Sequence, residues 1–499
     1  MKKIVIIFIL VIAAILSLKN LGNIYLWEDE AETAVIAKNV LIYGYPSPWD
    51  MKNLVTQQNG QDIAIVGNHY LWRWHPWLQY YVLAPFLKIF GRNAFAARLP
   101  FVLFGLGTIY LIYLIARRLF NERAAIFAIL FATLSWPYLV YIRQARYYAL
   151  VLFFTSLVIY FYLDFLEKRK NSWVWFSLAA ILLFHSNFVA FLGTILGLLL
   201  HFLIFNSRNI KEYLTKIALV LLVVSLFTLP WFFVVDYFSI KQQGVTFYSF
   251  LRSGKFYLKN INDYIFPLVV FIGFFFFIKS IYQHRKEISL LVVTASTIVI
   301  TAAITISYPY TRYVVGVFPL LFILAGVLFD WLMKKDKLFV MFIPVIILSN
   351  FFNQLPNFLL NPRYYQKITL DLGLFSYLYE INHNYDGPVE AIVNYINKHK
   401  NENTTVLTNY AWEPIIFHSD AKVINRIYDK NSKLYKLTED QNPQFIIPRQ
   451  CWGQMQIPEN YRKIELPQKD ICWENREEPS EHLFMTTVSG PNVVLFEKK

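Results

Sequence analysis

Long apolar stretches alternate with short polar connections over the first 356 residues of the chain. Eleven of these stretches are predicted as membrane spans, and most approach the ~20 residues that a helix needs to cross about 30 Å of hydrocarbon. They cover residues 4–19, 98–118, 123–141, 147–166, 173–188, 189–206, 214–235, 264–282, 288–307, 313–333 and 338–354. The pattern therefore predicts a polytopic α-helical membrane domain over residues 1–356, with about 11 transmembrane helices.

The segment between the first two spans, an outer loop at residues 20–97, is too patterned to be a simple connection. Residues 30–43 place apolar side chains at helical spacing, and Gly44 supplies a stop signal. After the polar stretch 50–68, residues 74–90 are aromatic and amphipathic, as is typical of a helix in the headgroup region. We therefore expect two interfacial helices in this loop.

The end of the chain has a different composition. Residues 357–384 form a tyrosine-rich connector that we expect at the membrane surface, and residues 385–499 read as a soluble domain. Helix and strand patterns alternate there, which predicts a small α/β domain. The predicted elements are residues 387–399, 405–408, 411–417, 422–424 and 445–447.

Composition and charge set the orientation. The chain is 56% hydrophobic, which is rare for a soluble protein. Lys and Arg occupy 17 of 40 positions in alternate short connections, beginning with the N-terminus, but 7 of 47 in the intervening ones. The positive-inside rule then predicts a multi-pass protein of the cell membrane with a cytoplasmic N-terminus. The outer loop and the C-terminal domain would be extracytoplasmic. We attribute the net charge of +14 to this bias and to contact with anionic lipid, and expect no nucleic-acid partner.

Two points at the ends of the chain have alternatives. Met1-Lys2-Lys3 and the apolar run after it resemble a cleaved signal peptide, but no small-x-small cleavage site follows, so a retained anchor is favoured. Cys451 and Cys472 are the only cysteines. They would form a disulfide in an oxidising compartment, or remain two buried thiols.

Candidate chemistry begins just past the first span, in the run Trp27-Glu28-Asp29-Glu30-Ala31-Glu32. Carboxylates are costly to hold at a bilayer surface and are useful as proton acceptors. The structural alternative is that Asp29 and Glu32, at Asp-x-x-Glu spacing, cap a helix. Basic side chains that could face these acids lie at outer span ends: Arg143, Arg146 and Arg312. Headgroup snorkelling is the alternative for Arg143 and Arg146.

Four short motifs share this outer location. They are Asp29-Glu30 with Ala37 and Gly44-Tyr45-Pro46; His75-Pro76 with Phe90-Gly91 and Arg98-Leu99-Pro100; Arg143-Gln144-Ala145-Arg146-Tyr147-Tyr148; and Arg312-Tyr313 with Pro319. Their order and spacing over residues 20–330 resemble the C-type membrane glycosyltransferases that use a polyprenyl-phosphate sugar donor. The nearest relatives look like the protein O-mannosyltransferases and the lipid A aminoarabinose transferases.

The resemblance implies an inverting glycosyltransferase that moves a hexose or pentose from a polyprenyl-phosphate carrier to a lipid, glycan or protein acceptor outside the cytoplasm. In the family, the Asp of the Asp-Glu pair is the general base, so the implied catalytic residues are Asp29 and Glu30, with Glu30 orienting the acceptor or a basic partner. The implied donor-phosphate ligands are Arg143, Arg146, Arg312, His75 and Arg73. His75 departs from the pattern, since the aminoarabinose transferases commonly have Lys before the proline.

The remaining candidates are substrate-binding side chains: Tyr147, Tyr148, Tyr313 and His185. His185 in His-Ser-Asn has a structural alternative as a satisfied helix-end histidine. We expect no cofactor and no essential metal, because the other outside acids, Asp62, Asp236 and Asp263, lack the spacing of a metal site. A divalent metal is the alternative, since Glu28-x-Glu30 resembles the acidic pairs of metal-dependent oligosaccharyltransferases.

Three other functions compete with this one. A transporter or flippase for a lipid-linked sugar would place ionisable residues and Gly or Pro breaks in the middle of its spans. Here the ionisable residues gather at outer span ends, which favours chemistry on a lipid headgroup. An oligosaccharyltransferase or polymer ligase is the alternative within the enzyme class. A scaffold that binds a partner through its C-terminal domain would leave the acids and arginines unexplained.

Overall fold

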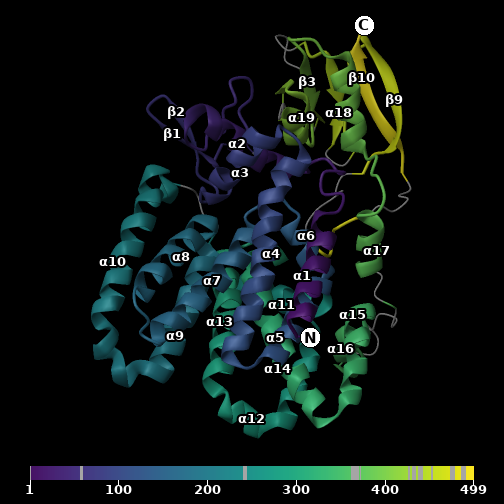
Figure 1. Ribbon diagram of the computed structural model, residues 1–499. Helices are drawn as coiled ribbons and strands as arrows, with labels where there is room; N and C mark the ends of the chain where they lie inside the picture. Colours follow the sequence, from purple (N-terminus) through teal and green to yellow (C-terminus); the bar gives the residue numbers. More distant parts are fainter. Residues whose placement is uncertain are drawn as a thin grey trace.

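The computed structural model describes residues 2–56, 60–239, 244–360, 370, 373–424, 428–429, 434–435, 442–450, 453–471, 478–484 and 490–499. Figure 1 shows a large helical bundle, a smaller part with a β-sheet formed by the C-terminal residues, and the outer loop lying between them. The N-terminal helix lies in the bundle, whereas the C-terminus lies in the sheet.

The bundle contains most of the helices of the chain. Its α-helices are α1 (Lys2–Leu18), α4 (Ala94–Leu119), α5 (Glu122–Leu134), α6 (Trp136–Ile142), α7 (Tyr148–Leu166), α8 (Ser172–Ser186), α9 (Phe188–Asn206), α10 (Ile210–Val234), α11 (Phe247–Asn260), α12 (Ile278–Gln283), α13 (Arg285–Thr305), α14 (Phe318–Lys335), α15 (Phe342–Leu348) and α16 (Phe351–Leu360). Shorter helical turns include η3 (Ile261–Ile265), η4 (Leu268–Phe277), η5 (Thr311–Val317) and η6 (Lys337–Met341).

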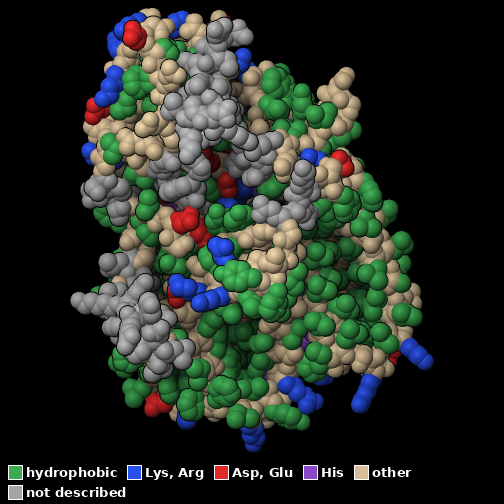
Figure 2. All heavy atoms as spheres, turned by 180° about the vertical axis from the view of Figure 1, so that it is seen from behind, with side chains coloured by type: hydrophobic (Ala, Val, Ile, Leu, Met, Phe, Trp, Pro, Cys, Tyr) green, Lys and Arg blue, Asp and Glu red, His purple; other side chains and the backbone are tan. Residues whose placement is uncertain are grey.

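The polytopic fold predicted from hydropathy is confirmed. Within the described residues, five helices are long and apolar enough to cross a membrane, or up to seven if each of two bent pairs is one span. Helical segments occupy all eleven predicted ranges, although the number of spans is not fixed by length and composition. Figure 2 shows hydrophobic side chains over the bundle and Lys and Arg side chains at its lower rim, as expected for a membrane-embedded surface.

Two helix pairs are sharply bent, one inside the predicted span 123–141 and one at the start of the predicted span 264–282. The range 123–141 divides into α5 and α6, which meet at an angle of 70°. The helix pair on either side of Phe266-Pro267 is bent by 84°. Each break precedes a proline, Pro137 or Pro267, which lacks a backbone N–H and restricts the residue before it.

Small residues allow close packing inside the bundle. A Cβ at Gly193 would lie 2.7 Å from the Cα of Ile298, and one at Gly197 would lie 2.6 Å from the Cα of Thr294. Helices α9 and α13 therefore approach so closely that only glycine fits at these two positions.

The outer loop contains both expected helices and a hairpin that the sequence did not indicate. Helix α2 (Glu28–Tyr43) ends at Gly44, whose φ of 80° is left-handed. Helix α3 (Leu78–Phe90) begins later than the predicted residue 74. Between them, β1 (Ile63–Val66) and β2 (His69–Trp72) pair antiparallel. Trp72, the last residue of β2, is fully buried.

The C-terminal residues form an α/β unit, as predicted. The helices are α17 (Gly373–Glu380), α18 (Pro388–His399) and α19 (Trp412–Ser419). The five-stranded sheet has the order β4-β3-β7-β10-β9, formed by β3 (Thr405–Thr408), β4 (Lys422–Ile424), β7 (Phe445–Ile447), β9 (Tyr461–Lys469) and β10 (Asn492–Lys498). A smaller sheet pairs β5 (Tyr428–Asp429), β6 (Leu434–Tyr435) and β8 (Gln454–Met455). Cys451 and Cys472, and with them the disulfide hypothesis, lie outside the described residues.

The C-terminal unit is attached directly to the acidic run. The Ala411 amide donates to Oε1 of Glu28 at 3.1 Å, and the Leu26 amide donates to Nε2 of His418 at 3.2 Å. The His418 ring stacks on Tyr25 at 4.1 Å, and burial together with Arg98 lowers its pKa to about 3. A neutral imidazole can accept the Leu26 hydrogen, so this contact persists at physiological pH.

Candidate active site

Asp29 lies in the first turn of α2, between two guanidinium groups. Its Oδ2 is 3.1 Å from Nη1 of Arg312 and 3.5 Å from Nη2 of Arg146. The N-cap of α2 is Trp27, which makes no side-chain capping hydrogen bond. The hypothesis that Asp29 serves as a helix cap is therefore wrong. The Asp29 side chain is 14% exposed, so solvent or a substrate reaches it from one side.

Arg146 is the buried member of the pair. It lies in the turn between α6 and α7, with its side chain 4% exposed, which rules out snorkelling to headgroups. Its Nη1 donates to the backbone carbonyl of Asp29 at 2.9 Å and to Oγ1 of Thr33 at 2.8 Å. It also lies 3.0 Å from Oε1 of Glu32. Burial acts to lower the pKa of Arg146, but Asp29 and other neighbours raise it well above its ordinary value, so the cation persists.

Arg312 is the more accessible member. It lies in η5, just before α14, with its side chain 18% exposed. The guanidinium is 4.3 Å from the ring centroid of Tyr310 and 5.6 Å from that of Tyr313. These aromatic faces support the cation without using its N–H donors. The exposed part of the Arg312 guanidinium can therefore contact an anion.

His75 joins the cluster as a neutral group. Its Nε2 lies 3.2 Å from Nη2 of Arg146, and its ring centroid is 5.3 Å from that of Tyr147. Burial, and then the positive charge of Arg146, hold the pKa of His75 well below its ordinary value. A guanidinium only donates, so Nε2 accepts and the remaining proton is on Nδ1. His75 therefore supplies no positive charge for a phosphate in this state.

The three predicted tyrosines surround the same place. Tyr147 lies beside Arg146, with its ring 5.8 Å from the guanidinium, and forms an edge contact with Tyr148. Both are fully buried, whereas Tyr313 is half-buried beside Arg312. Of the three, Tyr313 is the one that a substrate can contact without displacement of packed side chains.

Glu30 is saturated by its neighbours. Its Oε2 is 2.6 Å from Nη2 of Arg98, while its Oε1 accepts from Nε of Arg98 at 2.8 Å and from the Ala145 amide at 2.7 Å. The carboxylate is fully buried. Glu30 thus has the basic partner that the sequence led us to expect, and it fixes α2 to the turn that carries Arg146.

Three predicted site residues point elsewhere. Arg143 donates to the carbonyls at the end of α1, including that of Lys19 at 2.8 Å. Arg73 donates to Oγ of Ser239 at 2.7 Å, beyond the end of α10. His185 lies 2.9 Å from the carbonyl of Phe227, which joins α8 to α10. The structure does not bring these three side chains to the Asp29 cluster.

Two buried acids near the cluster were not predicted as site residues. Glu32, which could have been a surface charge, is 2% exposed; burial, against the opposing effect of Arg146, raises its pKa to about 8. Glu478 accepts the Thr311 amide at 2.9 and 3.0 Å and lies 3.4 Å from the Tyr141 hydroxyl. It thus holds the start of η5, the segment that carries Arg312. No local pattern marks Glu478, because its role depends on a contact 167 residues away.

The acids of the run do not converge as metal ligands would. In the part of the chain that the structure describes, no group of three or more His, Cys, Asp or Glu side chains could hold a metal ion. Glu28 is directed to Ala411 and Glu30 to Arg98, so the Glu28-x-Glu30 spacing does not become a shared site. The charge that faces Asp29 comes from guanidinium groups.

Known proteins resemble this chain in sequence and in fold. Residues 74–231 match the family model of dolichyl-phosphate-mannose-protein mannosyltransferases. An uncharacterized protein of Aquifex aeolicus (strain VF5) is 26% identical over 355 residues, which cover 68% of this chain and 66% of that protein.

The fold resembles ArnT from Cupriavidus metallidurans. The crystal structure bound to undecaprenyl phosphate superposes with a TM-score of 0.62 at 17% identity, covering 89% of this chain and 93% of ArnT. The apo structure gives a TM-score of 0.60 at 16% identity, covering 84% and 85%. The chain thus has the ArnT fold, and the resemblance to C-type membrane glycosyltransferases predicted from its motifs is confirmed.

Proposed function

We propose that this protein is an inverting glycosyltransferase that moves one sugar, a hexose or a pentose, from a polyprenyl-phosphate carrier to a hydroxyl acceptor. The acceptor would be a lipid, a glycan or a protein at the membrane face that carries α2 and the C-terminal unit, which we assign to the outside of the cell. The observation that carries the proposal is the placement of Asp29 against Arg312 and Arg146, at 3.1 and 3.5 Å.

The cluster supplies what the reaction requires. Asp29 accepts the proton of the acceptor hydroxyl, whose oxygen attacks the anomeric carbon from the face opposite the phosphate. The bond between that carbon and the phosphate oxygen breaks, so the configuration inverts and the polyprenyl phosphate leaves with the electron pair. Arg312 stabilises the charge that grows on the phosphate. Because the phosphate is a good leaving group, no general acid is needed.

The two arginines would have different roles. Arg146 is buried and bonded on several sides, so it holds the Asp29 segment in place. Arg312 is accessible, and a donor phosphate competes with Asp29 for its fork. Binding of the donor would then release Oδ2 of Asp29 for the acceptor. This arrangement links occupation of the donor site to activation of the base.

The fold supports the carrier class. ArnT, which has the same fold, was crystallised with undecaprenyl phosphate, and the family model that matches residues 74–231 is named for a dolichyl-phosphate-mannose donor. Both carriers are polyprenyl phosphates. We therefore propose that the donor is a polyprenyl-phosphate sugar and that the protein contacts the surrounding bilayer.

We expect the reaction to proceed without an added divalent metal, because two guanidinium groups already face Asp29. Transfer measured after dialysis against EDTA should keep most of its rate. Restoration of a lost rate by Mg²⁺ or Mn²⁺ would instead support the metal-dependent alternative.

The decisive experiment compares wild type with Asp29→Asn. Each purified protein is incubated with radiolabelled polyprenyl-phospho-sugars and membrane extract, and the label transferred to the acceptor fraction is measured. Loss of the general base should lower the rate by about 10²–10⁴-fold. Equal transfer by both proteins would remove Asp29 from its role.

Other outcomes separate the alternatives. Wild type that transfers no sugar from any donor would favour a transporter of lipid-linked sugars, whereas transfer only from a preassembled oligosaccharide donor would favour an oligosaccharyltransferase or ligase. A reporter fused after Lys499 tests the orientation. Activity of a cytoplasm-only reporter would place the proposed site on the wrong side of the membrane.

A further inference from the structure

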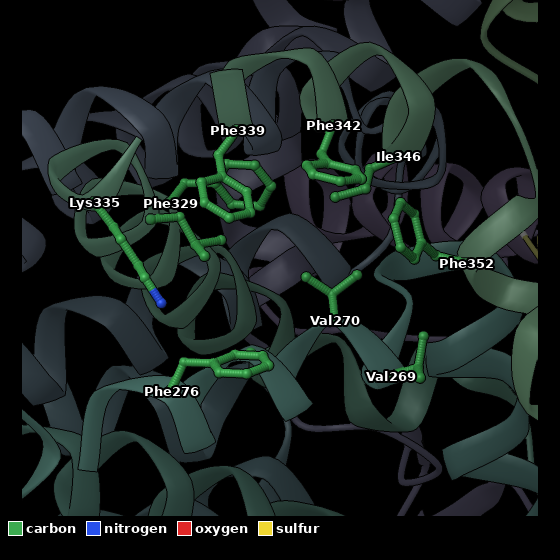
Figure 3. Close-up of a pocket in the computed structure, with 11 residues that line it drawn as sticks. Val269, Val270, Phe276, Phe329, Lys335, Phe339, Phe342, Ile346 and Phe352 are labelled. Carbon is green, nitrogen blue, oxygen red and sulfur yellow. The ribbon is translucent and has the colours of Figure 1, made fainter. Parts of the chain in front are cut away.

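A cavity of about 360 Å³ lies beside the C-terminal end of α14, away from the Asp29 cluster. Figure 3 shows the residues that line it. Helix α14 connects the two places, because it starts beside η5, which carries Arg312, and ends at Lys335. Its 18 residues correspond to about 27 Å along the helix axis. The volume is within the ~300–1,000 Å³ typical of small-molecule sites.

The lining of the cavity is apolar with one exception. Val269, Val270, Gly273 and Phe276 come from η4, and Phe329 and Leu332 from α14; the remaining apolar residues are Phe339, Phe342, Ile346 and Phe352. The exception is Lys335, whose Nζ lies 5.5 Å from the ring centroid of Phe276. Figure 3 shows the ammonium group on one side of the cavity and Phe342, Ile346 and Phe352 on the other.

Four of the lining residues come from η4, whose conformation is unusual. This segment is a 3-10 helix over ten residues, whereas such helices rarely exceed three or four. Gly273, in its middle, lies so close to α14 that a Cβ would be 3.3 Å from Cδ1 of Leu328. The missing side chain lets η4 pack closely against α14 at this point.

The cavity opens toward the surface that faces lipid. Phe276 is 73% exposed and Phe342 is 42% exposed, and both belong to the apolar surface of the bundle. In a bilayer this opening meets hydrocarbon chains rather than water. An acyl chain matches the lining, while a polar ligand would leave its own polar groups unsatisfied there.

The charge of Lys335 indicates which polar group a ligand of this cavity should carry. Its neighbour Lys334 has an acidic partner, with Nζ 2.7 Å from Oδ2 of Asp330. Among the described residues, the ion pairs include none for Lys335. Snorkelling alone explains a lysine at a span end, but it requires no cavity beneath the ammonium group. Apolar space beside an available cation is complementary to an anionic amphiphile.

We propose that this cavity binds one acyl chain of an anionic phospholipid, with Lys335 contacting the lipid phosphate. The lipid would belong to the leaflet opposite the Asp29 site, which our orientation makes the cytoplasmic one, where basic side chains attract anionic headgroups. The site is distinct from the donor site and does not depend on transferase activity.

The test uses photo-crosslinking in nanodiscs. The full-length protein is reconstituted with phosphatidylglycerol or phosphatidylcholine that carries a diazirine on an identical acyl chain, and crosslinked residues are mapped by mass spectrometry. We expect crosslinks on η4 and α15, with phosphatidylglycerol labelled about fivefold more than phosphatidylcholine. Equal labelling by the two lipids would overturn the role of Lys335.

Three variants and a competitor sharpen the test. Lys335→Gln should remove the preference for phosphatidylglycerol, whereas the matched control Lys334→Gln should keep it. Val270→Trp fills the cavity and should lower labelling by both lipids; unchanged labelling would contradict the proposed location. If this variant is not recovered as a monodisperse protein, the comparison of Lys335→Gln with Lys334→Gln still tests the proposal. Displacement of the probe by undecaprenyl phosphate at equal concentration would assign the cavity to the carrier and overturn the proposal.

Discussion

Two neighbouring carboxylates in the first turn of α2 have opposite surroundings. Glu30 is fully buried, and its oxygens accept from Arg98 and from the Ala145 amide. Asp29 is partly exposed, and its Oδ2 faces Arg146 and Arg312 from one side. Both are acids paired with arginine, but only Asp29 is exposed enough for a substrate to contact it. The comparison shows that accessibility, more than charge, distinguishes the acid that we propose as the general base from the one that fixes α2 in place.

The largest expected effect is the loss of folding stability when Glu30 is replaced. Glu30→Ala leaves the guanidinium of Arg98 buried without its partner, which typically costs about 3–5 kcal/mol. Asp29→Ala should cost about 1 kcal/mol or less, because its pairs are partly solvated. Thermal unfolding in one detergent measures both. Equal destabilisation by the two variants would erase the distinction between the acids.

The next effect concerns the two types of arginine. Arg312→Ala should lower kcat/KM for the donor by about 10²–10³-fold, as removal of a group that stabilises transition-state charge does. Arg143→Ala is the matched control, since its guanidinium bonds the carbonyls at the end of α1 and should affect stability more than donor kinetics. Kinetics with the polyprenyl-phosphate sugar measure both. A larger kinetic loss in Arg143→Ala would return that residue to the donor site.

A smaller effect tests how η5 is held. Glu478→Gln weakens a charged hydrogen bond to the Thr311 amide, so Arg312 should be less well placed. We expect kcat/KM for the donor to fall roughly tenfold, mainly because KM rises. Glu481→Gln, at an exposed position nearby, is the control. If both variants bind the donor as wild type does, Glu478 has a purely structural role.

The most gradual effect is a pH dependence of the free energy of unfolding from Glu32, spread over several pH units. Its pKa rises from 4.5 to about 8, so its contribution to stability is fully present below about pH 4.5 and is lost as the pH rises through 8. The slope in this window is at most about 1.4 kcal/mol per pH unit. Glu32→Gln should flatten it, as measured by unfolding between pH 5 and 9. A slope that persists in this variant would have to come from other groups.

Local patterns predicted much of the fold. Hydropathy indicated the bundle because a span is recognised from its own residues. The same holds for β3, β4 and β7, whose apolar runs are short and clear. Strand β9, in contrast, contains mostly charged and polar residues, and the hairpin β1-β2 lies beside a polar stretch. Both depend on pairing with a partner strand, which a single segment does not show.

The sequence predicted which span ends carry the site, but not which of their side chains come together. The sequence placed Asp29, Arg146 and Arg312 on one membrane face, and the structure brings these three together. It placed Arg143 and His185 there too, but the direction of a side chain depends on packing against other helices. Arg143 thus bonds the end of α1, and His185 bonds the Phe227 carbonyl.

The contact between Glu478 and Thr311 also bears on when the protein becomes competent during its synthesis. Glu478, which steadies the Arg312 segment, is made 167 residues after Thr311, when all the predicted spans have already been translated. A nascent chain therefore contains its acid and both guanidinium groups before their frame is complete. If the protein acts as we propose, a nascent chain would transfer no sugar before Glu478 has been made.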